Sequence, residues 1–379
     1  MMEQGAREQI RALYVHIPFC VRKCNYCDFF SLNLTENKIH ADAYLHLLQQ
    51  ELDSYGNSFD FSCLDSLYIG GGTPTIYPRL IDLVLWLKAS LDISGVAEIT
   101  VEANPCTLDK NLLRELKQAG VNRLSLGVQS FDDELLTEMG RLHSGSGAVA
   151  AVTEARKAGF DNISIDLMYG LPKQTMGVWR ETLMQAVSLS VRHISVYGLS
   201  IHEDTPWGEL MQKGMLASAE DSLHVEMMAY AAEFLSARGF EHYEISNFAL
   251  PGCRSRHNQS YWRRLNYLGL GAAAASCIES RRFKNADGDY FSAPPFSREV
   301  ETLSREQVLA EAVFLQLRMS DGVNIAEFNR RYAVSLLQKY GKEIEKLISY
   351  GLLESNNNVL KLTQKGIPLS NEVFLHFLP

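Results

Sequence analysis

Short apolar runs alternate with amphipathic stretches between residues 13 and 200. In residues 41–55, for example, Leu45, Leu48 and Leu52 recur at helical spacing. Regular alternation of strand and helix patterns is typical of βα units built around a parallel sheet. The pattern therefore predicts an α/β fold. Six units can be counted, with strands expected at 13–16, 66–69, 98–102, 123–127, 162–167 and 193–197.

The pattern changes after a long helix expected at 219–238. Residues 241–280 are rich in aromatic residues, glycine and histidine, and they indicate loops and short strands. Three helical patterns and a hairpin follow, which together predict a winged-helix-like α+β domain. These helices are expected at 303–319, 325–332 and 336–350, and the hairpin at 352–354 with 359–362.

The length of 379 residues favours one large domain with a smaller one, because single cores stop growing near roughly 250 to 300 residues. We therefore expect four parts. They are an N-terminal extension (1–12), the α/β unit (13–240), an aromatic-rich connecting region (241–300) and the winged-helix-like domain (301–379).

Charge and hydropathy exclude several classes of protein. The net charge of −9 argues against nucleic-acid binding, which needs a basic face. Winged helices often bind DNA, but the lysines of the C-terminal region are offset by glutamates, so we expect a docking or lid role there. The chain shows no secretory signal and no apolar run near the roughly 20 residues of a membrane span. The sequence predicts a cytoplasmic protein with no transmembrane segment and leaves peripheral membrane contact open.

Three of the seven cysteines fall within eight residues, as Cys20, Cys24 and Cys27 in a C-x3-C-x2-C spacing directly after the first strand. Clustered thiolates favour zinc or an iron–sulfur cluster over magnesium or calcium. A structural zinc site needs a fourth ligand nearby, and neither His16 nor His40 has a partner at ligand spacing. A four-iron cluster normally takes four cysteines. Three would leave one iron open to a small molecule, and this is the interpretation we favour.

The remaining cysteines are far apart in the sequence and do not suggest a disulfide framework. We expect all four to be buried thiols. They are Cys63, Cys106, Cys253 and Cys277.

Further candidate groups lie where the predicted strands end, which is where βα barrels collect their binding residues. A glycine triplet, Gly70–Gly72, precedes Thr73 and would let the backbone approach a ligand. Each polar residue taken alone could equally be a surface salt bridge or a helix cap. The polar candidates are Glu102, Gln129, Arg141 and Asp166.

His257 lies in the segment RHNQSYW, beside aromatic residues. A neutral imidazole there could bind a haem iron. A single histidine among aromatic residues is more often a hydrogen-bonded core residue, so the sequence leaves both readings open.

Seven motifs occur in a fixed order and together resemble the radical S-adenosylmethionine (SAM) family related to oxygen-independent coproporphyrinogen III oxidase. They are HIPFCVRKCNYCDF, GGGTPT, EANP, RLSLGVQSF, DLMYGLP, HYEISNFA and HNQSYW.

The resemblance implies an open (β/α)6 partial TIM barrel with a C-terminal helical domain, and a [4Fe-4S] cluster whose open iron binds SAM. Carried over by position, the cluster ligands are Cys20, Cys24 and Cys27. The implied SAM contacts are Tyr14, Gly71, Gly72, Thr73, Glu102, Gln129, Arg141 and Asp166.

Two branches of this family differ at the end of the cysteine motif. The oxidases carry a fourth cysteine two positions after the third, where this chain has Phe29, and they have a longer N-terminal arm. The CDF ending and the HNxxYW motif resemble the haem-chaperone branch instead, which implies His257 as a haem contact. We therefore expect a chaperone that passes haem to respiratory proteins and needs an electron donor. The alternative is an enzyme, an anaerobic coproporphyrinogen III decarboxylase.

Overall fold

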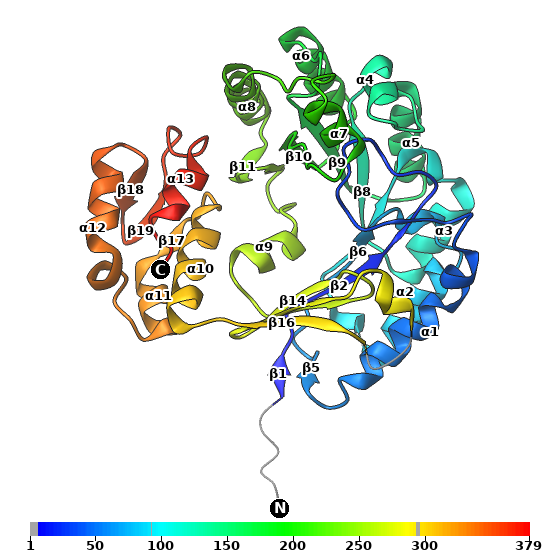
Figure 1. The fold of residues 1–379 in the computed structure, drawn as a ribbon, viewed down its shortest axis with the longest axis horizontal. Coiled ribbons are helices and arrows are strands. Elements are labelled where there is room, and N and C mark those ends of the chain that lie inside the picture. Colours follow the sequence, from blue (N-terminus) through cyan, green and yellow to red (C-terminus); the bar gives the residue numbers. More distant parts are fainter. Residues whose placement is uncertain (1–6, 92, 293–295) are drawn as a thin grey trace, which may run out of the picture.

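The computed structural model describes residues 7–91, 93–292 and 296–379 (Figure 1). Six parallel strands of this described part form an open barrel in the order β10-β9-β8-β7-β6-β2, which confirms the predicted fold class. The barrel stays open because β2 and β10 each border a further strand instead of each other. The six strands are β2 (Ala12–Ile17), β6 (Ser66–Gly71), β7 (Glu98–Ala103), β8 (Arg123–Gln129), β9 (Asn162–Tyr169) and β10 (His193–Gly198).

Helices return the chain between these strands and lie on the outer side of the curved sheet (Figure 1). Apolar side chains of α2, such as Leu83 and Leu87, pack into the main core. Gly120 ends α3 with a φ of 99°, in the left-handed region that glycine adopts readily. The helices are α1 (Lys38–Ser54), α2 (Leu80–Leu91), α3 (Lys110–Ala119), α4 (Asp133–Glu138), α5 (Gly145–Lys157), α6 (Met176–Ser188), α7 (Pro206–Gln212) and α8 (Asp221–Ser236).

The helical return after β8 is split into α4 and α5, and the glycines at 145 and 147 lie in the first turn of α5. Ser144 caps α5 by accepting a hydrogen bond from the Gly147 amide at 3.1 Å. A Cβ at position 145 would lie 2.2 Å from the carbonyl oxygen of Phe131. Glycine is therefore required at that position by close packing of two backbones.

Residues 241–300 extend the sheet at both edges. β11 (Glu241–Glu244) and β12 (Asn247–Ala249) continue it beyond β10, and β13 (Tyr267–Leu270) pairs in parallel with β2. Three antiparallel strands follow β13 outward. They are β14 (Ala275–Ile278), β15 (Arg281–Asn285) and β16 (Arg298–Thr302).

The segment RHNQSYW forms a helix, α9 (Arg256–Trp262), so the expectation of loops and short strands there was wrong. Ser255 caps this helix, and the carboxylate of Glu98 accepts the backbone N–H groups of Arg256 and His257 at 3.0 and 3.1 Å. Glu98 comes from a strand far away in sequence, which is why local pattern did not predict the helix.

Short elements complete the barrel. β1 (Glu8–Gln9) pairs with β5 (Phe59–Asp60), and β3 (Phe19–Cys20) pairs with β4 (Leu32–Asn33). Residues 1–6 of the expected N-terminal extension (1–12) lie outside the part of the chain that the structure describes. Four 3-10 turns are described, η1 (Pro74–Ile76), η2 (Ile93–Gly95), η3 (Pro105–Thr107) and η4 (Gly288–Ser292).

The C-terminal elements form a separate winged-helix-like unit, shown in orange to red in Figure 1. Its three strands pair in the antiparallel order β17-β19-β18, with a second hydrophobic core between them and the helices. The hairpin and three helices match the prediction. The elements are α10 (Arg305–Leu317), β17 (Val323–Asn324), α11 (Ile325–Tyr332), α12 (Leu336–Ser349), β18 (Leu353–Asn356), β19 (Val359–Leu362) and α13 (Ser370–Leu375).

The main core draws on residues from Ile10 to Tyr290 and the second core on residues from Leu309 to Phe377. The four-part division made from the sequence stays a prediction of how the chain divides into folding units. Among the residues described, no helix is both long and apolar enough to cross a membrane.

Burial of the four scattered cysteines was predicted correctly only for Cys277. Cys253 is half-buried, and Cys63 and Cys106 are exposed. Cys63 lies between β5 and β6 and Cys106 lies in η3, at positions where short connections run over the surface.

Candidate functional site

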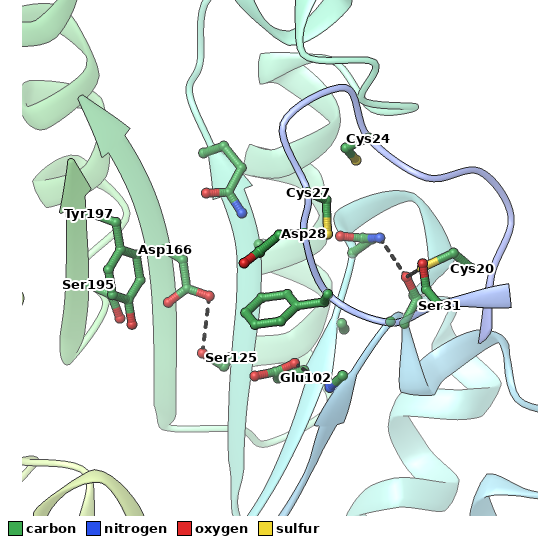
Figure 2. Close-up of a pocket in the computed structure, with 18 of the residues that line it drawn as sticks. Cys20, Cys24, Cys27, Asp28, Ser31, Glu102, Ser125, Asp166, Ser195 and Tyr197 are labelled. Atoms are coloured by element: carbon green, nitrogen blue, oxygen red, sulfur yellow. Dashed lines mark hydrogen bonds between the residues drawn. The ribbon is translucent and has the colours of Figure 1, made fainter. Parts of the chain in front are cut away.

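A cavity of about 560 Å³ opens at the carboxyl ends of the barrel strands. Figure 2 shows the cysteine loop on one side of it and residues of β8, β9 and β10 on the other. The structure brings all twelve sequence-predicted site residues to this cavity. They are Tyr14, Cys20, Cys24, Cys27, Gly71, Gly72, Thr73, Glu102, Gln129, Arg141, Asp166 and His257.

The three clustered cysteines lie on the loop between β2 and α1 as free thiols. The Sγ of Cys20 lies 3.6 Å from the hydroxyl of Thr73, and the Arg141 guanidinium donates to the Sγ of Cys24 at 3.5 Å. Burial raises the pKa of the Cys20 thiol and that of Cys27, the latter to about 11. Without a bound cation these thiols are therefore held neutral.

The loop offers three thiols as ligands for an iron–sulfur cluster. In the described residues no group of three or more His, Cys, Asp or Glu side chains is placed to hold one metal ion. A Cβ at Gly72 would lie 3.0 Å from the Sγ of Cys20, so glycine keeps space free beside that sulfur. The donor set and this space fit an iron–sulfur cluster.

Glu102 is hydrogen-bonded to the glycine segment Gly70–Gly72. One of its carboxylate oxygens accepts from the Tyr68 hydroxyl at 2.6 Å and the other from the Gly71 amide at 3.1 Å. Gly71 has a φ of 113°, and a Cβ there would lie 2.7 Å from the ring of His16. Burial, with Asp166 adding to it, raises the pKa of Glu102 to about 7. The site therefore holds a carboxyl group that can change its charge near neutral pH.

Arg141 and Asn104 connect the cysteine loop with the ends of β7 and β8. Arg141 donates to the side-chain oxygen of Asn104 and, at 2.5 Å, to the Gly127 carbonyl. Asn104 in turn donates to the Thr73 hydroxyl at 2.9 Å. A Cβ at Gly127 would lie 3.1 Å from the Gln129 amide nitrogen and 3.3 Å from Arg141. A glycine inside the strand lets these polar groups converge.

Asp166 lies on β9, opposite the cysteines. Its carboxylate accepts from the Ser125 hydroxyl at 3.5 Å, and Figure 2 shows Ser195 and Tyr197 of β10 beside it. Burial raises the pKa of Asp166, while a hydrogen bond with Ser195 and the charge of Arg123 lower it.

Several site residues were missed by sequence reasoning. Asn104 lies in the EANP motif, and Ser125 and Ser195 alternate with apolar residues on their strands, so period-two alternation was the available signal. Tyr68 likewise stands between apolar residues on its strand, and Tyr261 lies in the HNQSYW motif. Among the missed residues that line the cavity are Tyr68, Asn104, Ser125, Ser195, Tyr197 and Tyr261.

His257 is fully buried at the edge of this cavity and both of its ring nitrogens are engaged. Nδ1 is hydrogen-bonded to the Ser66 hydroxyl at 3.0 Å and Nε2 to the Tyr261 hydroxyl at 2.7 Å. Its ring stacks on Tyr68 with centroids 4.8 Å apart. Burial lowers the pKa of His257 to about 3, so the imidazole is neutral. Binding of a haem iron by His257 would require one of these hydrogen bonds to break, and the haem contact of His257 stays a prediction.

Tyr14 forms the wall of the cavity on β2. Its hydroxyl is hydrogen-bonded to Nδ1 of His16 at 2.9 Å, and its ring stacks on Tyr68 with centroids 6.2 Å apart. Tyr14, Tyr68, His257 and Tyr261 therefore form one aromatic cluster between the barrel and α9.

Two family models match the chain. Residues 14–186 match the radical SAM superfamily, and residues 303–369 match the HemN C-terminal domain.

Curated relatives match almost the whole chain. The haem chaperone HemW of Lactococcus lactis is 36% identical over 96% of this chain and 96% of its own length. The haem chaperone HemW of Bacillus subtilis is 37% identical over 97% of this chain and 99% of its own length. A mitochondrial radical S-adenosyl methionine domain-containing protein 1 of Danio rerio is 31% identical over 96% of this chain and 85% of its own length.

Among solved structures, coproporphyrinogen III oxidase (HemN) of Escherichia coli aligns with a TM-score of 0.82 and 23% identity. The alignment covers 98% of this chain and 90% of the oxidase. At this identity the match shows a shared fold.

Proposed function

Because this chain belongs to the HemW family of radical SAM proteins, we propose that it is a haem chaperone. It would bind haem and deliver it to haem-accepting respiratory proteins. The observation that carries the proposal is the similarity to HemW relatives over nearly the full length of both chains. Phe29 adds to it, because the related oxidases carry a cysteine at that position.

The cavity at the barrel mouth would hold a [4Fe-4S] cluster and SAM. Cys20, Cys24 and Cys27 would be the cluster ligands, since their three thiols share one loop and one cavity. A cluster with an open iron supplies a site for the amino and carboxylate groups of SAM and an electron for its reduction. The chain's own polar groups would hold the rest of SAM. They are Tyr14, Gly71, Gly72, Thr73, Glu102, Gln129, Arg141 and Asp166.

The geometry supports distinct tasks for these groups. Arg141 is a buried cation beside Cys24 and would balance the negative charge of a thiolate-bound cluster. The acids Glu102 and Asp166 lie deeper in the barrel and suit positively charged or hydroxyl groups of the cofactor. The electron donor, the identity of the haem acceptor and a cytoplasmic location stay predictions.

The test is a haem titration of the anaerobically reconstituted protein, followed by mixing with an apo-cytochrome from a respiratory complex. We expect a stable complex with a haem absorption band, and transfer of that band to the acceptor. No stable complex would overturn the proposal. The proposal would also be overturned if the protein produced protoporphyrinogen IX from coproporphyrinogen III with SAM and a reductant, which is the reaction of the alternative function.

The cluster assignment has its own control. Cys24→Ser is expected to lose the iron and sulfide bound after reconstitution, while Cys63→Ser, at an exposed cysteine outside the cavity, keeps both. An iron without a protein ligand should also make the cluster unstable in air. The decrease of the absorption bands of the cluster measures this loss. Equal iron content in the two variants would contradict the assignment.

A further inference from the structure

A second cavity, of about 820 Å³, adjoins the cavity at the barrel mouth. Its walls come from the cysteine loop, the end of α9, the hairpin β14–β15 and helix α10 of the C-terminal unit. Five residues line both cavities, so the two spaces are neighbours. The shared residues are Tyr14, Lys23, Asp28, Phe29 and Tyr261.

The size of this cavity is that of a cofactor site, since such pockets measure about 300 to 1,000 Å³. The barrel cavity is smaller, about 560 Å³, and the proposed function already places a cluster and SAM in it. A tetrapyrrole therefore needs a separate space. The second cavity is the larger of the two and adjoins the first.

Its lining suits a flat aromatic ring. Tyr261 and Trp262 from α9 and Phe314 from α10 supply aromatic walls, and Ala275 and Cys277 on the hairpin are small. Phe29 stands at the boundary of the two cavities and is 63% exposed. A bound ring lying against Phe29 would cover it.

The hairpin β14–β15 presents one face to this cavity. Cys277 pairs with Arg282 and Ala275 pairs with Lys284, so these four side chains share that face. Two cations thus stand two residues apart on β15, next to a small residue and a thiol. Two propionate groups at one edge of a tetrapyrrole need such a pair of cations.

These cations have protein partners at present. Arg282 contacts Glu311 and lies 3.5 Å from Glu301, and Lys284 lies 3.3 Å from Asp287. The side chains of Arg282 and Lys284 are about half exposed, with 42% and 51% of their surface accessible. The pairs of Arg282 with Glu301 and of Lys284 with Asp287 are exposed and contribute little free energy, so a carboxylate of a ligand can replace Glu301 and Asp287 at small cost. Glu311 has only 6% of its side chain exposed and keeps a second arginine partner.

Helix α9, which carries the motif, lines both cavities. His257 faces the barrel side and is fully hydrogen-bonded, while Trp262 faces the second cavity and Tyr261 borders both. Within the motif, a contact with haem therefore falls to Tyr261 and Trp262. His257 holds the Tyr261 hydroxyl in place.

We propose that haem binds in this second cavity, against the hairpin β14–β15, with its propionates on Arg282 and Lys284 and its ring against Tyr261 and Trp262. The proposal rests on the proposed function, because it names the place at which the haem chaperone would carry its cargo. It also places the haem directly beside the cluster loop, with Phe29 between them.

Two variants and two matched controls test this in the full, cluster-loaded chain. Ala275→Trp fills the cavity at an exposed β14 position, and Val300→Trp adds the same bulk at an exposed β16 position outside it. Arg282→Gln removes one cation, and Arg281→Gln removes its neighbour, which pairs with Glu8 outside the cavity. The readouts are the haem dissociation constant and absorption spectrum, with SAM binding measured in parallel.

We expect Ala275→Trp to abolish haem binding and to leave SAM binding unchanged. Arg282→Gln should weaken haem binding on the order of tenfold, the loss of one charge-assisted hydrogen bond, and both controls should bind like the wild type. If Ala275→Trp disturbs folding, the comparison of haem affinity between Arg282→Gln and Arg281→Gln still tests the proposed site. Wild-type haem affinity in both cavity variants would overturn the inference while leaving the chaperone function intact. Failure of the wild type to bind haem would overturn the function itself.

Discussion

Arg264 and Glu311 form an ion pair at 3.0 Å with only 6% of each side chain exposed. Arg264 follows α9 and Glu311 lies on α10, so this pair joins the motif helix to the C-terminal unit. Arg331 of α11 adds to the connection by donating to the carbonyl oxygens of Arg263 and Arg264 at 2.9 and 2.7 Å. The C-terminal unit is therefore held at the end of α9 that borders the second cavity.

Removing Glu311 should destabilise the protein strongly. Glu311→Ala leaves the buried Arg264 charge without its partner, which typically costs about 3 to 5 kcal/mol. Glu301→Ala is the control, because Glu301 is exposed and its pair with Arg282 should contribute less than about 1 kcal/mol. Urea unfolding of both variants measures the difference, and equal losses would contradict the assignment of Glu311 as the link.

The buried carboxylate of Glu51 should hold the outer strands to the barrel. It accepts hydrogen bonds from the Gly271 amide at 2.8 Å, and from Asn285 and Tyr290 at 2.7 Å each. Glu51→Ala would leave these donors unpaired, at about 1 to 3 kcal/mol for each buried group.

Faster amide hydrogen exchange in residues 275–285 is the expected local sign of this change. Glu306→Ala, which removes an exposed carboxylate paired with Lys339, serves as the control. Unchanged exchange in the Glu51 variant would show that the outer strands do not depend on it.

Two glycine substitutions should have opposite effects. In Gly72→Ala the new methyl group would lie 2.7 Å from the Phe19 carbonyl oxygen and 3.0 Å from the Sγ of Cys20. The cysteine loop must shift, so we expect less iron bound after reconstitution and a loss of about 1 to 3 kcal/mol.

Gly341→Ala lies inside α12, and among the described residues no heavy atom lies within 4 Å of its new Cβ apart from those of its chain neighbours and of the helix backbone. Alanine should stabilise that helix by about 1 kcal/mol. Thermal unfolding and iron analysis of both variants check the pair. Full iron content in the Gly72→Ala protein would contradict the proposal that this glycine keeps space free beside Cys20.

Ionisation of Glu102 should make the unbound protein less stable as the pH rises. The folded-state pKa of about 7 lies above the ordinary value of 4.5, so between these pH values the folded protein keeps a proton that the unfolded chain has released. This contribution is complete below pH 4.5 and is lost as the pH rises through 7, by at most about 1.4 kcal/mol per pH unit.

Glu102→Gln removes this titration. Relative to the variant, the wild type should lose unfolding free energy between pH 4.5 and 7. Urea unfolding at several pH values measures the difference, with the exposed Glu134→Gln as the control. If the difference in unfolding free energy between wild type and Glu102→Gln stays constant across this pH range, titration of Glu102 is excluded.

Local pattern predicted the regular parts of the fold. Each of the six barrel strands begins within one residue of its expected start, because a buried strand is marked by its own apolar run. The hairpin of the C-terminal unit was likewise marked by the asparagines at 356–358. Helix α9 was missed, since its first turn is capped from β7 by Glu98, which sequence proximity cannot reveal.

The amino-acid sequence was enough to identify the three cysteines of the C-x3-C-x2-C loop, the glycines beside them and the residues at the strand ends. Their spacing is local and the chain direction of parallel strands brings those ends together. The contacts between distant segments became known from the folded chain alone. It placed His257 among Ser66, Tyr68 and Tyr261, where its nitrogens are already bonded, and it opened a second cavity between α9, the β14–β15 hairpin and α10. Such contacts depend on the packing of side chains from separate elements, which no periodicity along one strand or helix records.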